Sequence, residues 1–311
     1  MQTILGSGGI ISQELELSLR EYTTDIRLVG RNPRAFHESN ELVTADLTNA
    51  EDTLRAVDGS EIAYLTIGLP YSYKQWYALW PVVMQNVIDA CKSHGTKLVF
   101  FDNIYMYDPE YLGNMKEDTP HNPPSKKGAV RKQIVDMLMK EIENDSLTAL
   151  IARCADYYGP GIERNGVLTE TVFKKFAAKQ KANWMGPLNF RHSYTYTPDA
   201  GRATAILGNT ADAFNQTWHL PTSANPLTGQ EWINAIASEM NAKPRTMILT
   251  RFIASIMGLF IPVMKELKEM MYQYDRDYVF NSEKFEQRFN FTPTPYKEGI
   301  AHIATTDYPK A

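Results

Sequence analysis

The glycine-rich segment Gly6-Ser7-Gly8-Gly9 constrains the fold of this chain more than any other feature. It follows a short expected strand at residues 2–5 and precedes residues 10–22, in which apolar residues recur at helical spacing. Glycines at a strand-to-helix turn allow a tight bend and let backbone N–H groups approach a phosphate. The segment therefore predicts a nucleotide-binding turn, although Ser12 stands where the usual pattern has its third glycine.

Strand and helix patterns alternate along the first half of the chain. That order predicts an α/β protein with a Rossmann-type, doubly wound parallel sheet, joined by right-handed crossovers and covered by helices on both faces. The expected strands are residues 2–5, 25–29, 42–45, 62–67, 97–101 and 148–152, and the expected helices are residues 10–22, 50–57, 76–94 and 126–144.

The pattern changes after Asp156, where turn residues cluster at 158–166. We expect a smaller C-terminal substrate lobe there, in which Thr228 and Glu231 form a capping box at the start of one helix. The predicted nucleotide-binding domain comprises residues 1–158, with 192–221 returning to it through a strand at 218–220, and the predicted lobe comprises residues 159–191 and 222–311. The expected helices of this half are residues 168–179, 228–240, 251–274 and 282–288.

Composition and charge exclude several classes of protein. The 311 residues are 43% apolar and 22% charged, with a net charge of −4 and no dense basic block, so no nucleic-acid partner is expected. The six histidines show neither H-x3-H nor HExxH spacing, so no metal site is expected. No G-x-S-x-G segment occurs, which excludes an α/β-hydrolase.

The cysteines and the apolar segments bear on where the protein resides. Cys91 and Cys154 are too few for a disulfide framework, which predicts two buried thiols in a reducing cytoplasm. The sequence does not open with a basic and then apolar signal segment. The longest apolar run, residues 252–264, contains Gly258 and Pro262 and is shorter than the roughly 20 residues of a membrane span. We expect a buried helix with a proline kink and no membrane contact.

The segment Gly30-Arg31-Asn32-Pro33-Arg34 follows the second expected strand. In dinucleotide-binding folds an acidic residue at this place bonds the ribose 2′-hydroxyl of NAD(H), whereas a basic residue accommodates the 2′-phosphate of NADP(H). No acid is present, and the guanidinium groups of Arg31 and Arg34 suit a phosphate. We therefore expect NADP(H) to be preferred over NAD(H). Asp46, after the third strand, could accept a hydrogen bond from the adenine amino group.

Several segments resemble the short-chain dehydrogenase/reductase superfamily. They are GSGGIIS, GRNPR, ADL at 45–47 and Asn86-Val87 in a long expected helix, followed by ARCADYYGPG at 152–161 and YTPDAGRA at 196–203. The likeness extends from residue 2 to about residue 300 and is greatest to the extended or atypical branch, the NAD-dependent epimerase/dehydratase family. It implies an oxidoreductase or epimerase that exchanges hydride between NADP(H) and a carbonyl or alcohol carbon of a small or sugar-like substrate.

The catalytic set of that family is a Ser or Thr, with a Tyr and a Lys four residues apart on one helix face. The resemblance puts Asn103 at the Ser/Thr position and Tyr107 at the tyrosine that precedes a glycine in the family. The segment PPSKKGAVRK at 123–132 matches the Tyr-Lys helix so that Lys132 takes the lysine position. Gly128 then takes the tyrosine position, and the usual general acid is missing.

Three interpretations of this gap remain open. In the first, Tyr105 or Tyr107 beside Asn103 replaces the acid, while Lys132 holds the nicotinamide ribose. In the second, the chain is a catalytically impaired NADP(H)-binding sensor or regulatory protein. In the third, the helix is aligned wrongly. Lys127 is a further candidate proton donor, on the condition that burial depresses its pKa.

The remaining expected site residues follow strand ends, where ligands bind in open α/β sheets. Those expected to face a substrate are Tyr71, Tyr157, Arg191 and His192. The expected cofactor-binding residues are Gly6, Gly8, Gly9, Ile10, Ile11, Arg31, Asn32, Arg34, Asp46, Leu47, Thr66, Gly68 and Lys132. The expected partners are a small-molecule substrate and a second copy of the chain, since the long helices at 76–94 and 126–144 resemble those that the family pairs in dimers.

Overall fold

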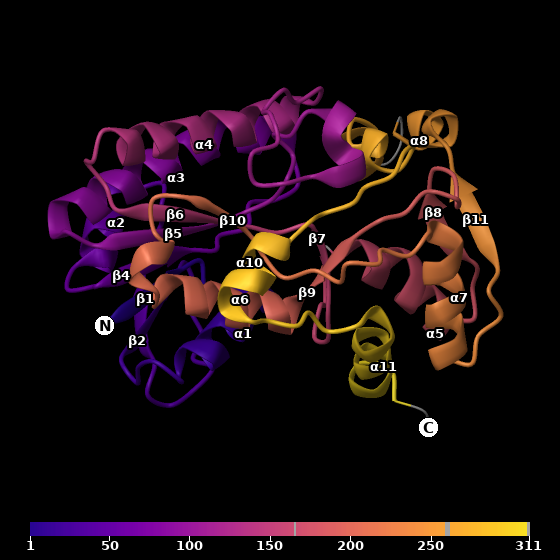
Figure 1. Ribbon diagram of the computed structural model, residues 1–311, viewed down its shortest axis with the longest axis horizontal. Helices are drawn as coiled ribbons and strands as arrows, with labels where there is room; N and C mark the ends of the chain where they lie inside the picture. Colours follow the sequence, from indigo (N-terminus) through magenta and orange to yellow (C-terminus); the bar gives the residue numbers. More distant parts are fainter. Residues whose placement is uncertain (165, 259–261, 310–311) are drawn as a thin grey trace. The chain divides into compact units, whose positions relative to one another are not determined.

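The computed structural model describes residues 1–164, 166–258 and 262–309, which form two compact units (Figure 1). Unit 1 comprises Met1–Met106, Lys126–Cys154 and Ala200–Leu220, and unit 2 comprises Tyr107–Ser125, Ala155–Asp199 and Pro221–Ala311. The two units are nearly equal in length, whereas the sequence predicted a smaller lobe. The difference arises mainly because residues 107–125, from the middle of the predicted first domain, belong to unit 2.

A seven-stranded parallel sheet forms the centre of unit 1, as the alternation predicted. Its order is β10-β6-β5-β4-β1-β2-β3. The order reverses at β1, which has β2 on one side and β4 on the other, so the carboxyl ends of β1 and β4 form the switch point at which such sheets bind ligands. The strands are β1 (Gln2–Leu5), β2 (Ile26–Gly30), β3 (Glu41–Thr44), β4 (Ile62–Leu65), β5 (Lys97–Asp102), β6 (Ala149–Arg153) and β10 (Thr217–His219).

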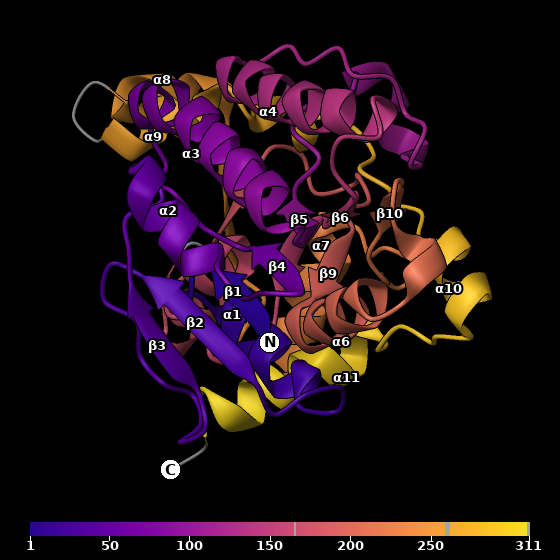
Figure 2. The same cartoon turned by 90° about the vertical axis from the view of Figure 1, so that its left-hand side faces the viewer.

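Helices cover both faces of this sheet (Figure 2). One face carries α2, α3 and α4, and the other carries α1 and α6. A close approach joins α1 to α6, because a Cβ at Gly201 would lie only 2.6 Å from the backbone carbonyl carbon of Glu14. The helices are α1 (Ile10–Leu19), α2 (Ala50–Val57), α3 (Tyr73–His94), α4 (Lys126–Glu143) and α6 (Thr197–Gly208), with a short 3-10 helix at Ala211–Ala213.

Unit 2 is built from two small parallel strand pairs and several short helices around an aromatic core. The core contains the buried rings of Tyr158, Tyr194 and Trp232. The strand pairs are β7 (Asp156–Tyr158) with β9 (Tyr194–Tyr196), and β8 (Ala182–Met185) with β11 (Thr246–Leu249). The helices are a π-type segment at Thr169–Phe173, α5 (Lys174–Ala177), α7 (Gly229–Glu239), α8 (Arg251–Met257), α9 (Pro262–Lys268), α10 (Glu283–Phe289), α11 (Tyr296–Thr306) and 3-10 helices at Pro109–Asn114 and Met271–Gln273.

The capping box predicted at the start of α7 is confirmed. The Thr228 backbone N–H donates to Glu231 Oε2 over 2.8 Å, and the Glu231 N–H donates to Thr228 Oγ1 over 3.3 Å. The single helix predicted at 251–274 is wrong, because α9 ends at Lys268 and a separate 3-10 helix follows at Met271–Gln273. Residues 259–261 of the predicted helix lie outside the described residues. The expected burial of this run is confirmed for Ala254, which has no exposed surface, and is wrong for Phe252 and Ile256, which are 75% and 47% exposed.

Other expectations concern membranes, thiols and metals. None of the helices that the structure describes is long and apolar enough to cross a membrane. Cys91 and Cys154 are buried and lie outside any disulfide among the described residues, and burial raises the pKa of Cys91 to about 12. Among the described residues, no group of three or more His, Cys, Asp or Glu side chains could hold a metal ion.

Candidate functional site

The turn between β1 and α1 is shaped by Gly6. Its φ is +107°, and a Cβ would lie 2.6 Å from the backbone N and Cα of Ile67, two residues after the end of β4. No other residue therefore fits at this position unless the backbone at Ile67 moves. Gly8 and Gly9 differ, because a Cβ on either would meet no atom within 4 Å. The backbone of the turn is therefore tightly packed at Gly6 and open on the side of Gly8 and Gly9, which is called its rim below.

The start of α1 offers hydrogen-bond donors at this rim. Ile10 and Ile11 are the first two helical residues, and their N–H groups have no acceptor among the described residues, as expected in a first turn. The Ser12 hydroxyl donates to the Gly9 carbonyl oxygen over 2.6 Å and accepts from the Gly9 N–H over 3.2 Å. The residue that departs from the glycine pattern thus caps the helix. The Ser7 hydroxyl is buried without a hydrogen-bond partner in the described part of the chain.

The ends of β2 and β3 bring Arg31 and Asp46 near each other. Asp46 Oδ1 accepts hydrogen bonds from the N–H and the hydroxyl of Thr48, at 3.0 and 2.8 Å. These bonds, and then the positive charge of Arg31, hold the pKa of Asp46 below its ordinary value. Asn32 and Arg34 are exposed after Arg31, as a surface that meets a ligand would be.

Three further residues predicted to bind the cofactor lie on neighbouring segments of unit 1. Leu47 is buried, and its carbonyl oxygen accepts from Asn86 Nδ2 over 3.0 Å. Thr66 follows β4, where its hydroxyl lies 3.4 Å from the carbonyl oxygens of Leu5 and Gly6. Gly68 is exposed beyond it. The predicted cofactor residues other than Lys132 therefore gather at the carboxyl ends of β1 to β4.

The predicted catalytic residues after β5 do not form one group. Asn103 Oδ1 accepts from the Tyr105 backbone N–H over 3.0 Å. The Tyr105 ring stacks on Trp76 of α3, with centroids 6.1 Å apart and planes 18° apart. Tyr107 belongs to unit 2, where it is fully buried and its ring lies 5.7 Å from that of His121.

The structure places Lys132 on the outer face of α4. Its amine lies 2.5 Å from Asp136 Oδ2, and its side chain is 39% exposed. Lys132, Asp136 and Lys140 line a shallow outer groove rather than the sheet side of the helix. Gly128 is buried, and it has no side chain that could move a proton. The contact of Lys132 with a nicotinamide ribose stays a prediction.

A buried ion cluster at the end of β5 was not predicted from the sequence. Arg131 of α4 donates from Nε to Asp102 Oδ1 over 3.0 Å and from Nη2 to the same oxygen, and Arg153 Nε lies 3.5 Å from Asp102 Oδ2. The Arg131 guanidinium also lies over the rings of Trp80 and Phe100, at 4.4 and 5.1 Å. A carboxylate at a strand end, with an arginine on the following helix, was the available signal.

Lys127 is also buried on this side of α4. The structure gives it no exposed surface, and its amine lies 4.7 Å from the centroid of the Tyr71 ring. Tyr71, predicted to face a substrate, makes an edge-on contact with Trp76 at 5.7 Å. Lys127 is therefore buried next to a residue predicted to face a substrate, and its role as a proton donor stays a prediction.

The other predicted substrate residues lie in unit 2. Tyr157 is half-buried on β7. Arg191 is exposed and bound to Asp277 through Nε at 3.0 Å and Nη2 at 2.6 Å. Burial alone would raise the pKa of Asp277, but the Arg191 hydrogen bonds and charge outweigh it and lower that pKa.

His192 is packed into an aromatic stack. Its ring lies 4.1 Å from that of Tyr278 and 4.4 Å from that of Tyr274, nearly parallel to both. Its Nε2 lies 3.0 Å from Asp156 Oδ2, which also accepts the Tyr274 hydroxyl over 2.8 Å. Since His192 is only 2% exposed, its ring is held by the fold and does not face solvent.

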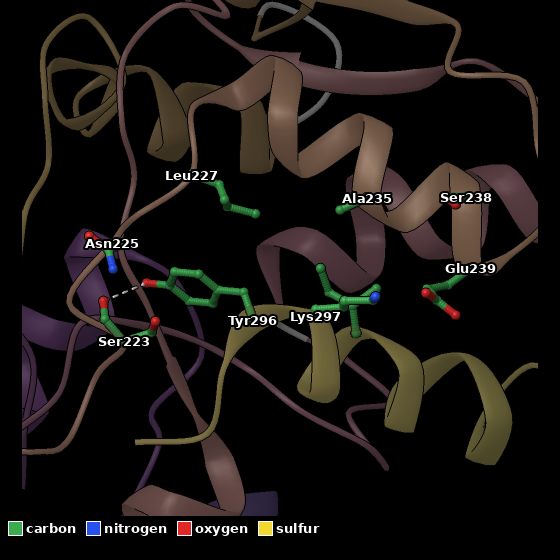
Figure 3. Close-up of a pocket in the computed structure, with 9 residues that line it drawn as sticks. Ser223, Asn225, Leu227, Ala235, Ser238, Glu239, Tyr296 and Lys297 are labelled. Atoms are coloured by element: carbon green, nitrogen blue, oxygen red, sulfur yellow. Dashed lines mark hydrogen bonds between the residues drawn. The ribbon is translucent and has the colours of Figure 1, made fainter. Parts of the chain in front are cut away.

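A pocket of about 390 Å³ opens between α7 and α11 in unit 2 (Figure 3). Tyr296 points toward Ser223 and its hydroxyl donates to the Ser223 carbonyl oxygen over 3.4 Å, while Leu227 and Ala235 provide apolar surface. Burial raises the pKa of Tyr296 above its ordinary value. No residue predicted from the sequence lines this pocket, so it does not extend the candidate site.

Comparisons with known proteins bear on the family and the fold of the chain. The family model described as the NAD dependent epimerase/dehydratase family matches residues 3–218. No curated protein sequence matches the chain.

Solved structures show the same fold at low sequence identity. A UDP-glucuronic acid 4-epimerase from Bacillus cereus in complex with NAD is 15% identical, with a TM-score of 0.79 over 100% of this chain and 99% of that one. A UDP-glucose 4-epimerase from Thermus thermophilus in complex with NAD is 15% identical, with a TM-score of 0.77 over 98% of each chain. A dTDP-glucose 4,6-dehydratase from Bacillus anthracis with NAD is 15% identical, with a TM-score of 0.77 over 98% and 96%. With a family model matching most of its length, the chain belongs to the NAD dependent epimerase/dehydratase family.

Proposed function

We propose that this protein binds NADP(H) and exchanges hydride between that cofactor and a carbonyl or alcohol carbon of a small or sugar-like substrate. The observation that carries the proposal is the β1–α1 turn. Gly6 has no room for a side chain, whereas Gly8 and Gly9 face open space before two N–H groups of a helix N-terminus. A pyrophosphate suits such a place because the helix dipole and the free N–H groups both favour negative charge.

The residues around the turn fit a dinucleotide. The cofactor supplies or accepts the hydride. Gly8 to Ile11 would bind the pyrophosphate through backbone N–H groups, and the buried Ser7 hydroxyl provides a further polar atom below them. Asp46 and Leu47 would contact the adenine, and Thr66 and Gly68 would lie along the nicotinamide half. Asn103, after β5, would orient the substrate oxygen through its side-chain amide.

The preference for NADP(H) is part of the proposal. The carboxyl end of β2 carries Arg31 and no acid, and Arg34 follows in an exposed segment. A 2′-phosphate would gain charge-assisted hydrogen bonds there, which the 2′-hydroxyl of NAD(H) would not. The neighbours named above contain NAD, so this preference would set the chain apart from them.

Calorimetric titration with NADPH and with NADH tests the proposal directly. We expect NADPH to bind at least tenfold more tightly than NADH. Equal affinities would contradict the preference, and binding of neither would contradict the proposed function.

A catalytically impaired NADP(H)-binding sensor is the second candidate. It is favoured by Gly128, which removes the usual acid, and by Lys132, which lies on the outer face of α4. Loss of a general acid costs about 10² to 10⁴ in rate. A protein that binds NADPH tightly but oxidises it with no member of a panel of aldehydes, ketones and nucleotide sugars would support the sensor.

A cytoplasmic location and a homodimer complete the proposal. Both cysteines are buried and neither forms a disulfide among the described residues, as in proteins of reducing compartments. Tyr77 and Val82 of α3 are 63% and 43% exposed, which leaves apolar surface on one of the two helices expected to pair. Sedimentation velocity would show a species of twice the 35.3 kDa chain mass, and a monomer at micromolar concentration would contradict the dimer.

A further inference from the structure

The two faces of α4 separate its basic residues into two groups. The side toward the sheet carries Lys127 and Arg131, followed by apolar residues one and two turns later. The outer side carries Lys132 and Lys140 in the shallow groove. Residues four apart lie one above the other on a helix, so Lys127 and Arg131 are neighbours on the same face.

The position of that face is fixed by Arg131. Its two hydrogen bonds to Asp102 tie α4 to the last residue of β5, and Asn103 follows Asp102 directly. The side chains of Arg131 and Asp102 are both at least 95% buried. A buried ion pair of this kind cannot shift by one residue without leaving a charge uncompensated. The Arg131–Asp102 pair therefore fixes which face of α4 lies toward the end of β5. One turn before Arg131, the residue on that face is Lys127.

Lys127 is joined to the segment after β5 by a row of aromatic rings. Its amine lies over Tyr71, Tyr71 meets Trp76 edge-on, and Trp76 stacks on Tyr105. Tyr105 in turn donates its backbone N–H to Asn103. The amine thus belongs to the same local structure as the residue proposed to orient the substrate oxygen.

We propose that Lys127 is the catalytic residue that faces the reacting end of the bound dinucleotide and exchanges a proton with the substrate oxygen, and that Arg131 is its positioning residue. The inference rests on the proposed function. In the reducing direction the Lys127 ammonium gives a proton to the carbonyl oxygen, while the carbonyl carbon receives hydride from NADPH. The C=O π pair becomes the O–H bond, and the neutral amine takes a proton from solvent.

The chemistry of the two side chains supports this division of roles. A lysine amine can give and take a proton, and general acid–base lysines are found in buried sites. An arginine stays charged in proteins, so Arg131 can hold a geometry but cannot exchange the proton. Like the Tyr and Lys of the family pattern, Lys127 and Arg131 are four residues apart on one face of a helix. The group proposed to exchange the proton is here an amine instead of a tyrosine hydroxyl.

Periodate-oxidised NADP⁺ provides a test that needs no substrate. Only the nicotinamide ribose of NADP⁺ has a free vicinal diol, because the other ribose carries the 2′-phosphate, so oxidation places two aldehydes on the nicotinamide side. A nearby amine condenses with an aldehyde to an imine and water, and cyanoborohydride reduces the imine to a stable secondary amine. Peptide mass spectrometry then identifies the modified lysine.

We expect the label on Lys127, with Lys126 and Lys132 of the same helix unmodified. Excess intact NADP⁺ should lower the labelling at least tenfold. Lys127→Met should abolish it, and Lys140→Met, on the outer face, should leave it unchanged. Lys127→Arg keeps a buried cation, so it guards against a folding defect in the methionine variant while still removing the reactive amine.

Calorimetry on the same samples separates the two proposals. Failure of the wild-type protein to bind NADPH overturns the proposed function, and the inference with it. Binding of NADPH with the label on Lys132 or Lys126, or on no lysine of α4, overturns the inference alone. Binding with protected labelling of Lys127 supports both.

Discussion

Two places along the carboxyl edge of the unit 1 sheet are held by different physics. At the β1–α1 turn the backbone is fixed by a lack of side chains, since Gly6 touches Ile67 and nothing stands over Gly8 or Gly9. At the β5–α4 edge the geometry is fixed by buried charge, since Asp102 binds Arg131 and lies near Arg153. The β1–α1 turn has no room for an added side-chain atom, whereas the β5–α4 edge is destabilised when a charged partner is removed. Substitutions should therefore fail at the two places for opposite reasons.

The largest effect is expected for Gly6→Ala. The added Cβ meets backbone atoms at 2.6 Å and the φ is +107°, so strain and overpacking together should cost about 4 kcal/mol of unfolding free energy. Calorimetry should detect no NADPH binding. Gly8→Ala is the matched control, because its Cβ meets no protein atom; it should change stability by less than about 1 kcal/mol in urea unfolding. Equal losses for both variants would show that the turn is not sterically fixed.

Arg131→Met removes a partner from the buried cluster and should come second. It leaves Asp102 with one arginine instead of two, and loss of one side of a buried pair costs about 3 kcal/mol. Urea unfolding measures the loss, and the label described for Lys127 should fall with it because the helix face is no longer fixed. A change below 1 kcal/mol would mean that packing on Trp80 and Phe100, not charge, holds this edge.

The same contrast explains what the sequence could predict. Strands β1, β4 and β6 are buried throughout, and β4 and most of β6 are short apolar runs, so the alternation of such segments with helices indicates a parallel sheet. The β1–α1 turn was predictable because its requirement is local: glycine is needed where a backbone passes close. Local patterns also predicted α2 and the start of α7.

The β5–α4 edge was not predictable in the same way. Lys127, Gly128, Arg131 and Lys132 are adjacent along the chain, and the choice between faces of α4 depends on which residue finds Asp102, 29 positions from Arg131. A shift of one residue in the alignment of α4 places an exposed lysine where a buried one lies. Likewise, β8 and β11 form a pair between distant segments, and two residues of β11 are exposed, so neither strand shows a clear pattern.

Arg31→Ser sharpens the comparison at the open side of the turn. Loss of one charge-assisted contact to a 2′-phosphate should weaken NADPH binding about tenfold, which is about 1.4 kcal/mol, and leave NADH binding unchanged. The loss should shrink as salt rises, because Arg31 is exposed. An equal loss for both cofactors would assign Arg31 to the turn itself and not to the 2′-phosphate.

Arg191→Met in unit 2 measures how much an exposed Arg–Asp pair contributes to stability, for comparison with the buried pair of Arg131 and Asp102. Arg191 lowers the pKa of Asp277, so the pair stabilises the fold above the ordinary carboxylate pKa and the contribution is lost as pH falls through the lowered value. At neutral pH the variant should lose at most about 1 kcal/mol. Thermal unfolding of the two proteins should converge once the pH falls below the lowered pKa of Asp277, where the carboxylate is protonated in both the folded and the unfolded state. A difference that persists there would assign the effect to packing.

Lys132→Met should have the smallest effect, and it decides which face of α4 is functional. Lys132 pairs with Asp136 one turn later, and both side chains are well exposed, so the lost pair should cost less than about 0.5 kcal/mol. NADPH affinity should not change, because the amine lies in the outer groove. If instead this variant bound NADPH tenfold more weakly while Lys127→Met bound it normally, the ribose would lie on the outer face. The buried cluster at Asp102 would then be a structural anchor with no part in the chemistry.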